Sequence, residues 1–283
     1  MPELPEVETV CRGMKSSMIG KIISLVEIKR DGLRWPFPDK MGDRITGQTV
    51  SNITRRAKYI LVELASNETI IIHLGMSGRI LIKDKPTAVF LDDKKISEKH
   101  DHIKFYLNDG FTIIFNDARR FGAMDLVLTR ELDNHWLLKK IGPEPLGNSL
   151  NSEYLLKAFK KKSISIKTAL LDQQLIAGLG NIYACEILYR SKISPNQKVK
   201  QLSKKRIEKL IQIIRIVLLE AIDAGGSSLK DHRQTSGEIG YFQYNFTVYG
   251  RMNEKCLKND CEAKVKRILQ GGRSTFYCPK CQR

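Results

Sequence analysis

The chain has 283 residues, an ordinary hydrophobic fraction of 42% and a formal net charge of +17. This length predicts two domains, and the composition excludes an intrinsically disordered protein. The positive excess favours a polyanionic partner, with nucleic acid ahead of an anionic membrane surface, because solubility alone does not need so one-sided a balance.

Membrane and secretory classes are excluded by the apolar pattern. The most apolar late stretch, 211–222, contains Gln212, Arg215 and Glu220 and is too short to span a bilayer. The acidic, proline-containing N-terminus does not resemble a secretory signal. We therefore expect a cytoplasmic protein with no membrane partner, whose cysteines are thiols or metal ligands rather than disulfides.

The N-terminus carries an unusual candidate nucleophile. Removal of Met1, which a small second residue normally permits, leaves Pro2 as a secondary amine close to Glu3 and Glu6. An α-amino group has a reference pKa of about 7.7–8.0, so part of it is uncharged near neutrality. Such an amine can attack a sugar C1′ and form an iminium, with Glu3 moving protons. Taken alone, however, the string is more typical of a helix start, and apolar spacing from Val7 to Met18 predicts that helix.

Strands are predicted after this helix. β-branched and aromatic residues with much alternation lie at 21–29, 49–64, 69–74, 79–82, 103–107 and 111–115. Asn108-Asp109-Gly110 predicts a hairpin between the last two. Antiparallel strands joined in this way predict a β-sandwich or barrel-like first half, with the charged segment 92–101 as an exposed loop.

The pattern becomes helical beyond residue 130. Gly142-Pro143-Glu144-Pro145 is typical of a linker, and helices are predicted at 153–161, 166–173, 181–189 and 203–223. Ser203 is the expected N-cap of the last helix, and Gly225-Gly226 ends it. The segment from Ser227 to Gly240, rich in glycine and serine, predicts a loop.

Four of the six cysteines lie in the last 28 residues, as Cys256-x4-Cys261-x16-Cys278-x2-Cys281. Two close pairs separated by a hairpin-length span predict a site for one Zn²⁺ held by four thiolates. Four sulfur ligands leave no open position for water, so the metal is expected to be structural. The span between the pairs is basic, which suits phosphate contact.

A glycine-rich turn, Ala177-Gly178-Leu179-Gly180, leads into the helix predicted to start at Asn181. Backbone N–H groups at such a helix start can hold a phosphate oxygen, and Asn181 could cap the helix and reach the same phosphate. A simple helix-to-helix turn explains this string equally well. No lysine with serine or threonine follows the glycines, which argues against a nucleotide cofactor.

Three further strings carry candidate DNA contacts. Lys58 lies within a strand-like run, where it can point into a cleft. His73-Leu74-Gly75-Met76-Ser77-Gly78 is a turn with a flexible apolar side chain, and Asp117–Gly122 places a cation and an aromatic ring in a loop. Proteins unstack a duplex with such apolar wedges and arginines, although each string alone is more typical of core packing or surface charge.

Together these strings resemble the bacterial formamidopyrimidine-DNA glycosylase family over essentially the whole chain. The resemblance rests on Pro2-Glu3-Leu4-Pro5-Glu6, Arg56-Ala57-Lys58-Tyr59, the His73–Gly78 turn, Gly180-Asn181-Ile182-Tyr183-Ala184 and Thr275-Phe276-Tyr277-Cys278. It implies an α+β fold of two domains: an N-terminal β-sandwich flanked by helices, and a helix–two-turns–helix domain with a zinc-finger hairpin. We expect boundaries of 1–132 for the first domain, 133–150 for the linker, 151–245 for the helical domain and 246–283 for the finger.

The resemblance also implies roles for individual residues. Pro2 is the nucleophile, Glu3 the proton donor and acceptor, and Lys58 a catalytic lysine, with Glu6 orienting the nucleophile. Asn181 and Arg273 hold a phosphate. Met76, Arg119 and Phe121 fill the space of the extruded base. His73, Lys167 and Tyr241 are further DNA contacts, the last two near a lesion pocket that includes the loop 227–241. Ala118 departs from the proline common in the family, which could loosen its loop, and the x4 spacing of the first cysteine pair departs from a common x2.

The expected activity is excision of oxidised purines from duplex DNA through a Schiff base on Pro2, followed by strand cleavage in base-excision repair. One rival is an endonuclease VIII-like glycosylase for oxidised pyrimidines, which Met76, Arg119, Phe121 and Leu4 disfavour. Another is a catalytically silent DNA-binding zinc protein, for which Pro2, Glu3 and Lys58 would have no use. Damaged double-stranded DNA is the expected partner of a monomer associated with the bacterial nucleoid.

Overall fold

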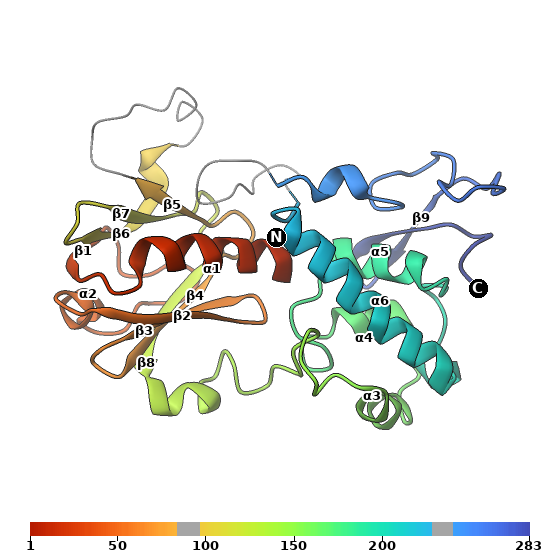
Figure 1. Ribbon diagram of the computed structural model, residues 1–283, viewed down its shortest axis with the longest axis horizontal. Coiled ribbons are helices and arrows are strands. Elements are labelled where there is room, and N and C mark those ends of the chain that lie inside the picture. Colours follow the sequence, from red (N-terminus) through yellow and green to blue (C-terminus); the bar gives the residue numbers. More distant parts are fainter. Residues whose placement is uncertain (84–96, 228–239) are drawn as a thin grey trace. The chain divides into compact units, whose positions relative to one another are not determined.

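A computed structural model describes residues 1–83, 97–227 and 240–283 of the chain (Figure 1). The chain forms two compact units, Met1–Lys139 with Gly225–Gly240, and Lys140–Ala224 with Tyr241–Arg283. The finer boundaries at 132, 150 and 245 stay predictions. Within the described residues, no helix combines the length and the apolar character that a membrane crossing requires.

The first unit contains two four-stranded antiparallel sheets. One sheet has the order β1-β6-β7-β5 and the other the order β2-β3-β4-β8. The strands of the first are β1 (Ile23–Ile28), β6 (Asp101–Leu107), β7 (Thr112–Asn116) and β5 (Arg79–Lys83); those of the second are β2 (Val50–Arg56), β3 (Tyr59–Leu64), β4 (Glu68–His73) and β8 (Ala123–Leu128). This arrangement confirms the β-sandwich.

Helix α1 (Leu4–Met18) supplies part of the core of this unit. Its apolar residues recur at helical spacing and all lie buried: Val7, Val10, Cys11, Met14 and Met18. They join one cluster with inward-facing residues of both sheets, and the helix packs against β2, β3 and β5. The sandwich therefore fixes the start of α1, where Pro2 and Glu3 lie.

The structure corrects two strand predictions. The run predicted as one strand, 49–64, is two strands joined by a tight turn at Ala57 and Lys58. Ala57 has φ +53°, a left-handed conformation that ends the strand and that apolar alternation cannot reveal. Strand β8 was not predicted, whereas the hairpin at Asn108–Gly110 is confirmed by the pairing of β6 with β7. The short helices α2 (Met41–Ile45), η2 (Glu98–His100) and η3 (Thr129–Asn134) complete the unit.

The second unit is helical with one β-hairpin. Its helices are α3 (Ser152–Phe159), α4 (Ile166–Leu171), α5 (Asn181–Arg190) and α6 (Lys204–Asp223), with short helices η4 (Val199–Gln201) and η5 (Phe242–Asn245). Each longer helix matches its prediction within two residues, and Ser203 caps α6 through the backbone N–H of Arg206. Strands β9 (Lys266–Gln270) and β10 (Arg273–Tyr277) form the basic hairpin, and α5 packs against both α6 and β10.

Candidate active site and DNA-binding groups

The start of α1 presents the candidate nucleophile and its acid. Pro2 and Glu3 are buried, whereas Met1 is 49% exposed. Glu3 is the N-cap, and it forms a capping box with Glu6, whose Oε2 accepts a hydrogen bond of 2.8 Å from the Glu3 backbone N–H. The helix-start interpretation of this string is thus correct for the backbone. It also leaves Glu3 held directly beside Pro2.

Glu6 also accepts hydrogen bonds from Ser227, in the same unit. Its Oε1 accepts hydrogen bonds from the backbone N–H of Ser227 at 2.8 Å and from the Ser227 hydroxyl at 2.9 Å. A side chain at Gly226, whose φ is +78°, would come within 3.2 Å of Glu6. One buried carboxyl group therefore fixes both the backbone at Glu3 and the point where the segment 228–239 begins. That segment, most of the predicted loop 227–240, lies outside the described residues.

Lys58 is buried in the turn between β2 and β3. Arg55, also largely buried, donates through Nε to Glu8 of α1 at 2.8 Å and through Nη1 to the carbonyl oxygen of Ala57 at 3.0 Å. The turn that carries Lys58 is thereby tied to the helix that carries Glu3. The sequence pattern gave no signal of this connection.

His73 ends strand β4 next to this turn. Its ring lies against Tyr59, with centroids 4.8 Å apart, and its Nδ1 accepts a hydrogen bond of 3.1 Å from the Gly75 backbone N–H. Burial, together with the positive charges of Lys58 and Arg34, lowers the pKa of His73 to about 4. His73 is therefore neutral at pH 7, with its proton on Nε2.

The three candidate gap-filling residues lie on two neighbouring turns. Met76 is 40% exposed and Phe121 46% exposed, while the Arg119 guanidinium carbon lies 4.8 Å from the centroid of the Phe121 ring. A side chain at Gly75 would collide with the backbone of Phe121 and Gly122 at 2.3 and 2.4 Å. The two turns are thus in backbone contact, and both present apolar surface to solvent.

Lys167 and Asn181 meet in the interior of the second unit. The side chain of Lys167 is fully buried, and its Nζ donates to Asn181 Oδ1 and Thr275 Oγ1 at 2.6 Å each, and to the Ser274 carbonyl oxygen at 3.2 Å. Asn181 Nδ2 also donates to that carbonyl oxygen, at 2.9 Å. Asn181 is the first residue of α5 and Gly180 its N-cap, so the predicted capping role of Asn181 is wrong: its side chain turns to β10 instead.

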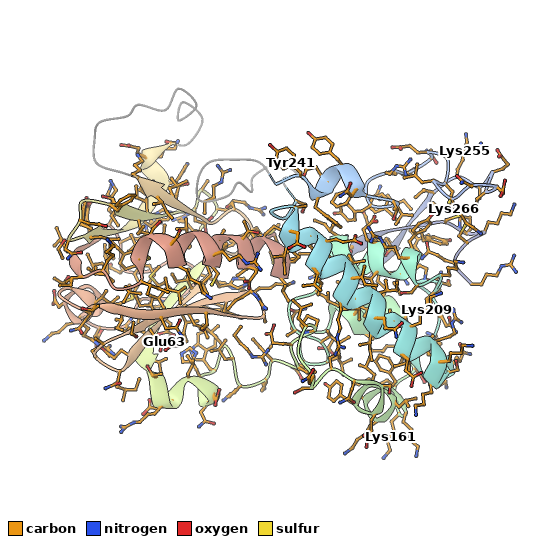
Figure 2. The ribbon with its side chains drawn as sticks, viewed as in Figure 1. Glu63, Lys161, Lys209, Tyr241, Lys255 and Lys266 are labelled. Carbon is orange, nitrogen blue, oxygen red and sulfur yellow. The ribbon has the colours of Figure 1, made fainter. Side chains whose placement is uncertain are left out.

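The second unit also carries exposed cationic and aromatic side chains. Arg273 begins β10 and is exposed, directly before Ser274 and Thr275. Tyr241 is also exposed and stacks with Tyr244, their centroids 6.5 Å apart. Figure 2 shows the side chain of Tyr241 at the surface and those of Lys255 and Lys266 pointing outward from the finger. An anionic ligand can reach these exposed groups, although Lys255 Nζ already pairs with Glu262 at 3.0 Å.

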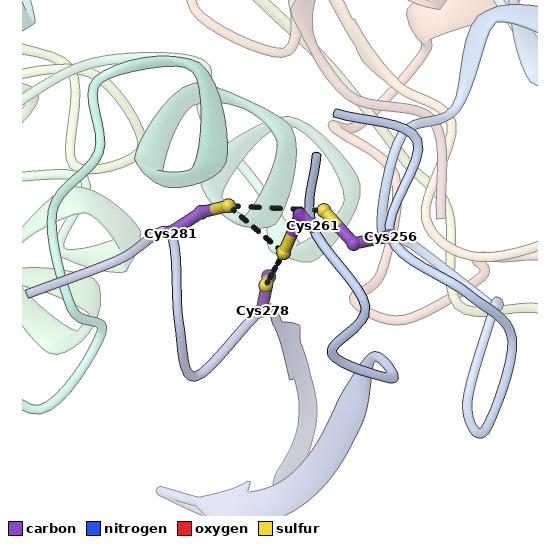
Figure 3. Close-up of side chains that lie close together, drawn as sticks. All are labelled: Cys256, Cys261, Cys278 and Cys281. Carbon is purple, nitrogen blue, oxygen red and sulfur yellow. Dashed lines mark hydrogen bonds between the residues drawn. The ribbon is translucent and has the colours of Figure 1, made fainter. Parts of the chain in front are cut away.

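The four predicted cysteines converge on one point (Figure 3). Their Sγ atoms all lie within 4.8 Å of one another, with separations of 3.8 Å for Cys256–Cys281, 3.7 Å for Cys261–Cys278 and 3.5 Å for Cys261–Cys281. Sulfurs at the corners of a tetrahedron with metal–sulfur bonds of about 2.3 Å lie about 3.8 Å apart. The donor set and its spacing fit a structural metal.

Helix α5 holds the finger through two side chains that sequence reasoning missed. Glu186 is fully buried and accepts hydrogen bonds from the backbone N–H groups of Thr247, Val248 and Tyr249 at 2.8–3.0 Å. Tyr189 places its hydroxyl 3.2 Å from Cys256 Sγ. Only the position of Glu186 on an otherwise apolar helix face could have signalled a buried carboxylate.

Two family models match most of the chain. The formamidopyrimidine-DNA glycosylase N-terminal domain matches residues 1–124, and the formamidopyrimidine-DNA glycosylase H2TH domain, the helix–two-turns–helix domain, matches residues 141–233. Each matched range lies largely in one of the two compact units. Fold and site together define a DNA glycosylase of the helix–two-turns–helix class.

Relatives match from end to end. The formamidopyrimidine-DNA glycosylase of Ruegeria pomeroyi is 54% identical and that of Jannaschia sp. 53% identical, each over 283 residues and the whole of both chains. Solved structures of the Lactococcus lactis Fpg bound to DNA containing an abasic site (34% identity, TM-score 0.87, 99% of each chain) and to DNA containing an oxidised pyrimidine (35%, 0.87, 100% of each) share the fold. The chain belongs to the formamidopyrimidine-DNA glycosylase family, whose members are glycosylases and abasic-site lyases.

Proposed function

We propose that this chain excises 8-oxoguanine and formamidopyrimidines from duplex DNA and cuts the strand at the resulting site, with Pro2 as the nucleophile. One observation carries the proposal. Glu3 is buried, fixed by its capping box with Glu6, and directly follows Pro2, in a chain that matches the family over its whole length. If the carboxyl group of Glu3 were exposed and rotated freely in solvent, it would transfer protons less efficiently.

The chemistry follows from this placement. Removal of Met1 frees the Pro2 amine, which attacks C1′ of the extruded nucleotide. The N-glycosidic bond breaks, and its electron pair leaves with the base, which is protonated. The amine then loses its proton and its lone pair forms the C1′ iminium as the C1′–O4′ bond breaks, with Glu3 protonating O4′. The iminium accepts the electrons released on deprotonation of the sugar, as β- and then δ-elimination expel the 3′ and 5′ phosphates. Lys58, held near α1 by Arg55, supplies a positive charge near the reacting strand.

DNA binding is assigned to exposed side chains and to the buried residue that positions one of them. Asn181 and Arg273 contact a backbone phosphate, and Met76, Arg119 and Phe121 enter the space that the base vacates. His73 and Tyr241 make further DNA contacts. Lys167 acts through Asn181 and β10, because its own ammonium group is buried among their oxygens.

We further propose that the four cysteines hold one Zn²⁺, which would supply structural cross-linking of the finger and no reaction step. Four thiolate ligands suit this ion better than the oxygen-preferring divalent cations. The protein acts in the cytoplasm, on chromosomal DNA.

The decisive experiment is borohydride trapping on a duplex with 8-oxoguanine opposite cytosine, followed by mass mapping of the adduct. A covalent link at the Pro2 amine is the expected result, lost in Glu3→Gln and in a matched chain whose N-terminus is extended by one residue. Absence of an adduct, with lesion binding retained, would indicate a silent DNA-binding protein.

A second substrate class has one specific observation in its favour. The Lactococcus lactis Fpg has been solved with an oxidised pyrimidine in its DNA, at 35% identity to this chain. The rates at which the protein releases 8-oxoguanine and thymine glycol from duplex DNA distinguish the two substrate classes. We expect the purine to be released faster, and dominant release of thymine glycol would reverse the assignment.

A further inference from the structure

A single buried carboxyl group connects the turns that carry Met76 and Phe121. Asp117, which directly follows β7, is fully buried. Its Oδ1 accepts hydrogen bonds from the Ser77 hydroxyl at 2.5 Å and from the Arg119 backbone N–H at 3.2 Å. Its Oδ2 accepts one of 2.8 Å from the Gly122 backbone N–H. Of these donors, Ser77 and Gly122 directly follow Met76 and Phe121, and Arg119 is itself a candidate gap-filling residue.

The geometry leaves the two turns little independent motion. The Arg119 backbone N–H also donates to the Ser77 hydroxyl oxygen at 3.2 Å, and Gly75 has no room for a side chain against the Phe121 backbone. The backbone carbonyl oxygen of Asp117 accepts a bond of 2.8 Å from His102 Nε2. Asp117 is thereby fixed to strand β6, within the sandwich.

We infer that Asp117 is a positioning residue that holds Met76 and the Arg119–Phe121 pair as one rigid wedge for base extrusion. This inference rests on the proposed function. A half-exposed apolar side chain displaces a base faster when its backbone is already ordered, because ordering it on insertion would raise the barrier.

Ala118, the residue after Asp117, makes the order of this turn depend more strongly on the Asp117 side chain. Ala118 lacks the fixed φ that a proline would give to the turn. The turn is closed by the bond from the Arg120 backbone N–H to the Asp117 carbonyl oxygen at 3.3 Å, with Arg120 at φ +59°. The Asp117 side chain, which bonds the backbone two residues on, constrains the turn where the alanine does not.

Ser77→Ala tests the connection while keeping the carboxylate. The rate of base extrusion, followed by the fluorescence of 2-aminopurine next to 8-oxoguanine, should fall about 10-fold, the usual effect of losing a hydrogen bond to a charged group. The kcat/KM for 8-oxoguanine excision should fall equally. Cleavage of a preformed abasic site, which has no base to extrude, should change less than about 2-fold.

A matched control is Thr69→Val, which removes another buried hydroxyl bond of this unit, to Thr129 at 2.9 Å, away from both turns. It should leave extrusion unchanged. In the Met76→Ala background, Ser77→Ala should add no more than about 2-fold, because the side chain that it positions is absent. Asp117→Asn, which turns one acceptor into a donor facing a backbone N–H, should slow extrusion more than Ser77→Ala.

Three results would overturn the inference: a Ser77→Ala enzyme as fast as Thr69→Val, equal losses on both substrates, or fully multiplicative effects of Ser77→Ala and Met76→Ala. Failure of the proposed function is distinguishable, because the wild-type protein would then cut neither substrate while the fluorescence signal would still report whether the wedge enters the duplex.

Discussion

Lys167 Nζ lies 2.6 Å from Asn181 Oδ1 and, being fully buried, holds it from the interior. The same ammonium group reaches Thr275 and Ser274, the residues that follow Arg273 on β10. One cation therefore connects the first residue of α5 with the strand that starts at the other proposed phosphate ligand. Asn181 and Arg273, which are 92 positions apart in the sequence, are therefore both supported by the Lys167 side chain.

Replacing this cation should weaken both the fold and DNA binding. Lys167→Met removes the hydrogen bonds to Asn181, Ser274 and Thr275 and takes a donor from the buried oxygens of Asn181 and Thr275, so we expect the unfolding free energy to fall by about 2–3 kcal/mol. Affinity for DNA with an abasic-site analogue should fall at least about 10-fold, because Asn181 loses its support. Chemical denaturation and fluorescence anisotropy measure the two effects.

Lys161→Met is the matched control for this change. Lys161 is exposed, as Figure 2 shows at the end of its unit, so the same substitution there should leave the unfolding free energy within about 0.5 kcal/mol. Equal behaviour of the two variants would contradict the role given to Lys167.

The sequence was sufficient for features that depend on local pattern. Apolar spacing located α1 and α6 because burial follows the helical period, and the cysteine spacing located the metal site because a hairpin brings its two ends together. Motif resemblance singled out Pro2 and Glu3 as candidates, and the family that it indicated is the one whose N-terminal domain matches residues 1–124.

Contacts between segments that lie far apart in the sequence could not be predicted from local patterns. Lys167 meets Thr275 across 108 positions and Glu6 meets Ser227 across 221, and neither pairing leaves a periodic signal. Lys58 was placed within a strand because nothing in apolar alternation reports that Ala57 adopts a positive φ. Asp117 was assigned only to a loop, since its burial depends on Ser77 and Gly122 folding around it.

The cysteine cluster predicts a metal content. Purified protein should contain about one zinc ion per chain by mass spectrometry, and Cys281→Ala should lose it. Without the metal the finger loses its cross-link, so DNA affinity should fall while helices of the second unit persist. Cys11→Ala is the control, because Cys11 is buried in the sandwich core and lies outside the cluster. Full zinc content in Cys281→Ala would refute the four-cysteine site.

Arg273 should account for about one phosphate contact. In Arg273→Gln, the slope of log K against log salt should become shallower by about 0.9, and binding should weaken for lesion and undamaged DNA alike. Titrations between about 50 and 200 mM salt measure this slope. Arg130→Gln removes another exposed charge, in the other unit, and should leave the slope unchanged. Loss of affinity for lesion DNA alone would assign Arg273 to base recognition instead.

His73 should make stability depend on pH in a defined window. Its pKa is about 4 in the folded protein and about 6.5 when unfolded, so above pH 6.5 both states are neutral and the residue contributes no pH dependence. As the pH falls from about 6.5 to 4, only the unfolded state takes up this proton, and folding loses at most about 1.4 kcal/mol per pH unit. Below pH 4 the folded state is protonated too, and the loss stops growing.

Comparison with His73→Gln isolates this contribution, since the other titrating groups are common to both proteins. The unfolding free energy of the wild type minus that of His73→Gln should decrease steadily from pH 6.5 to pH 4 and stay constant above pH 7. Urea denaturation at each pH gives both values. A difference that is constant across the window would mean that His73 titrates normally, and that neither its burial nor the charge of Lys58 depresses its pKa.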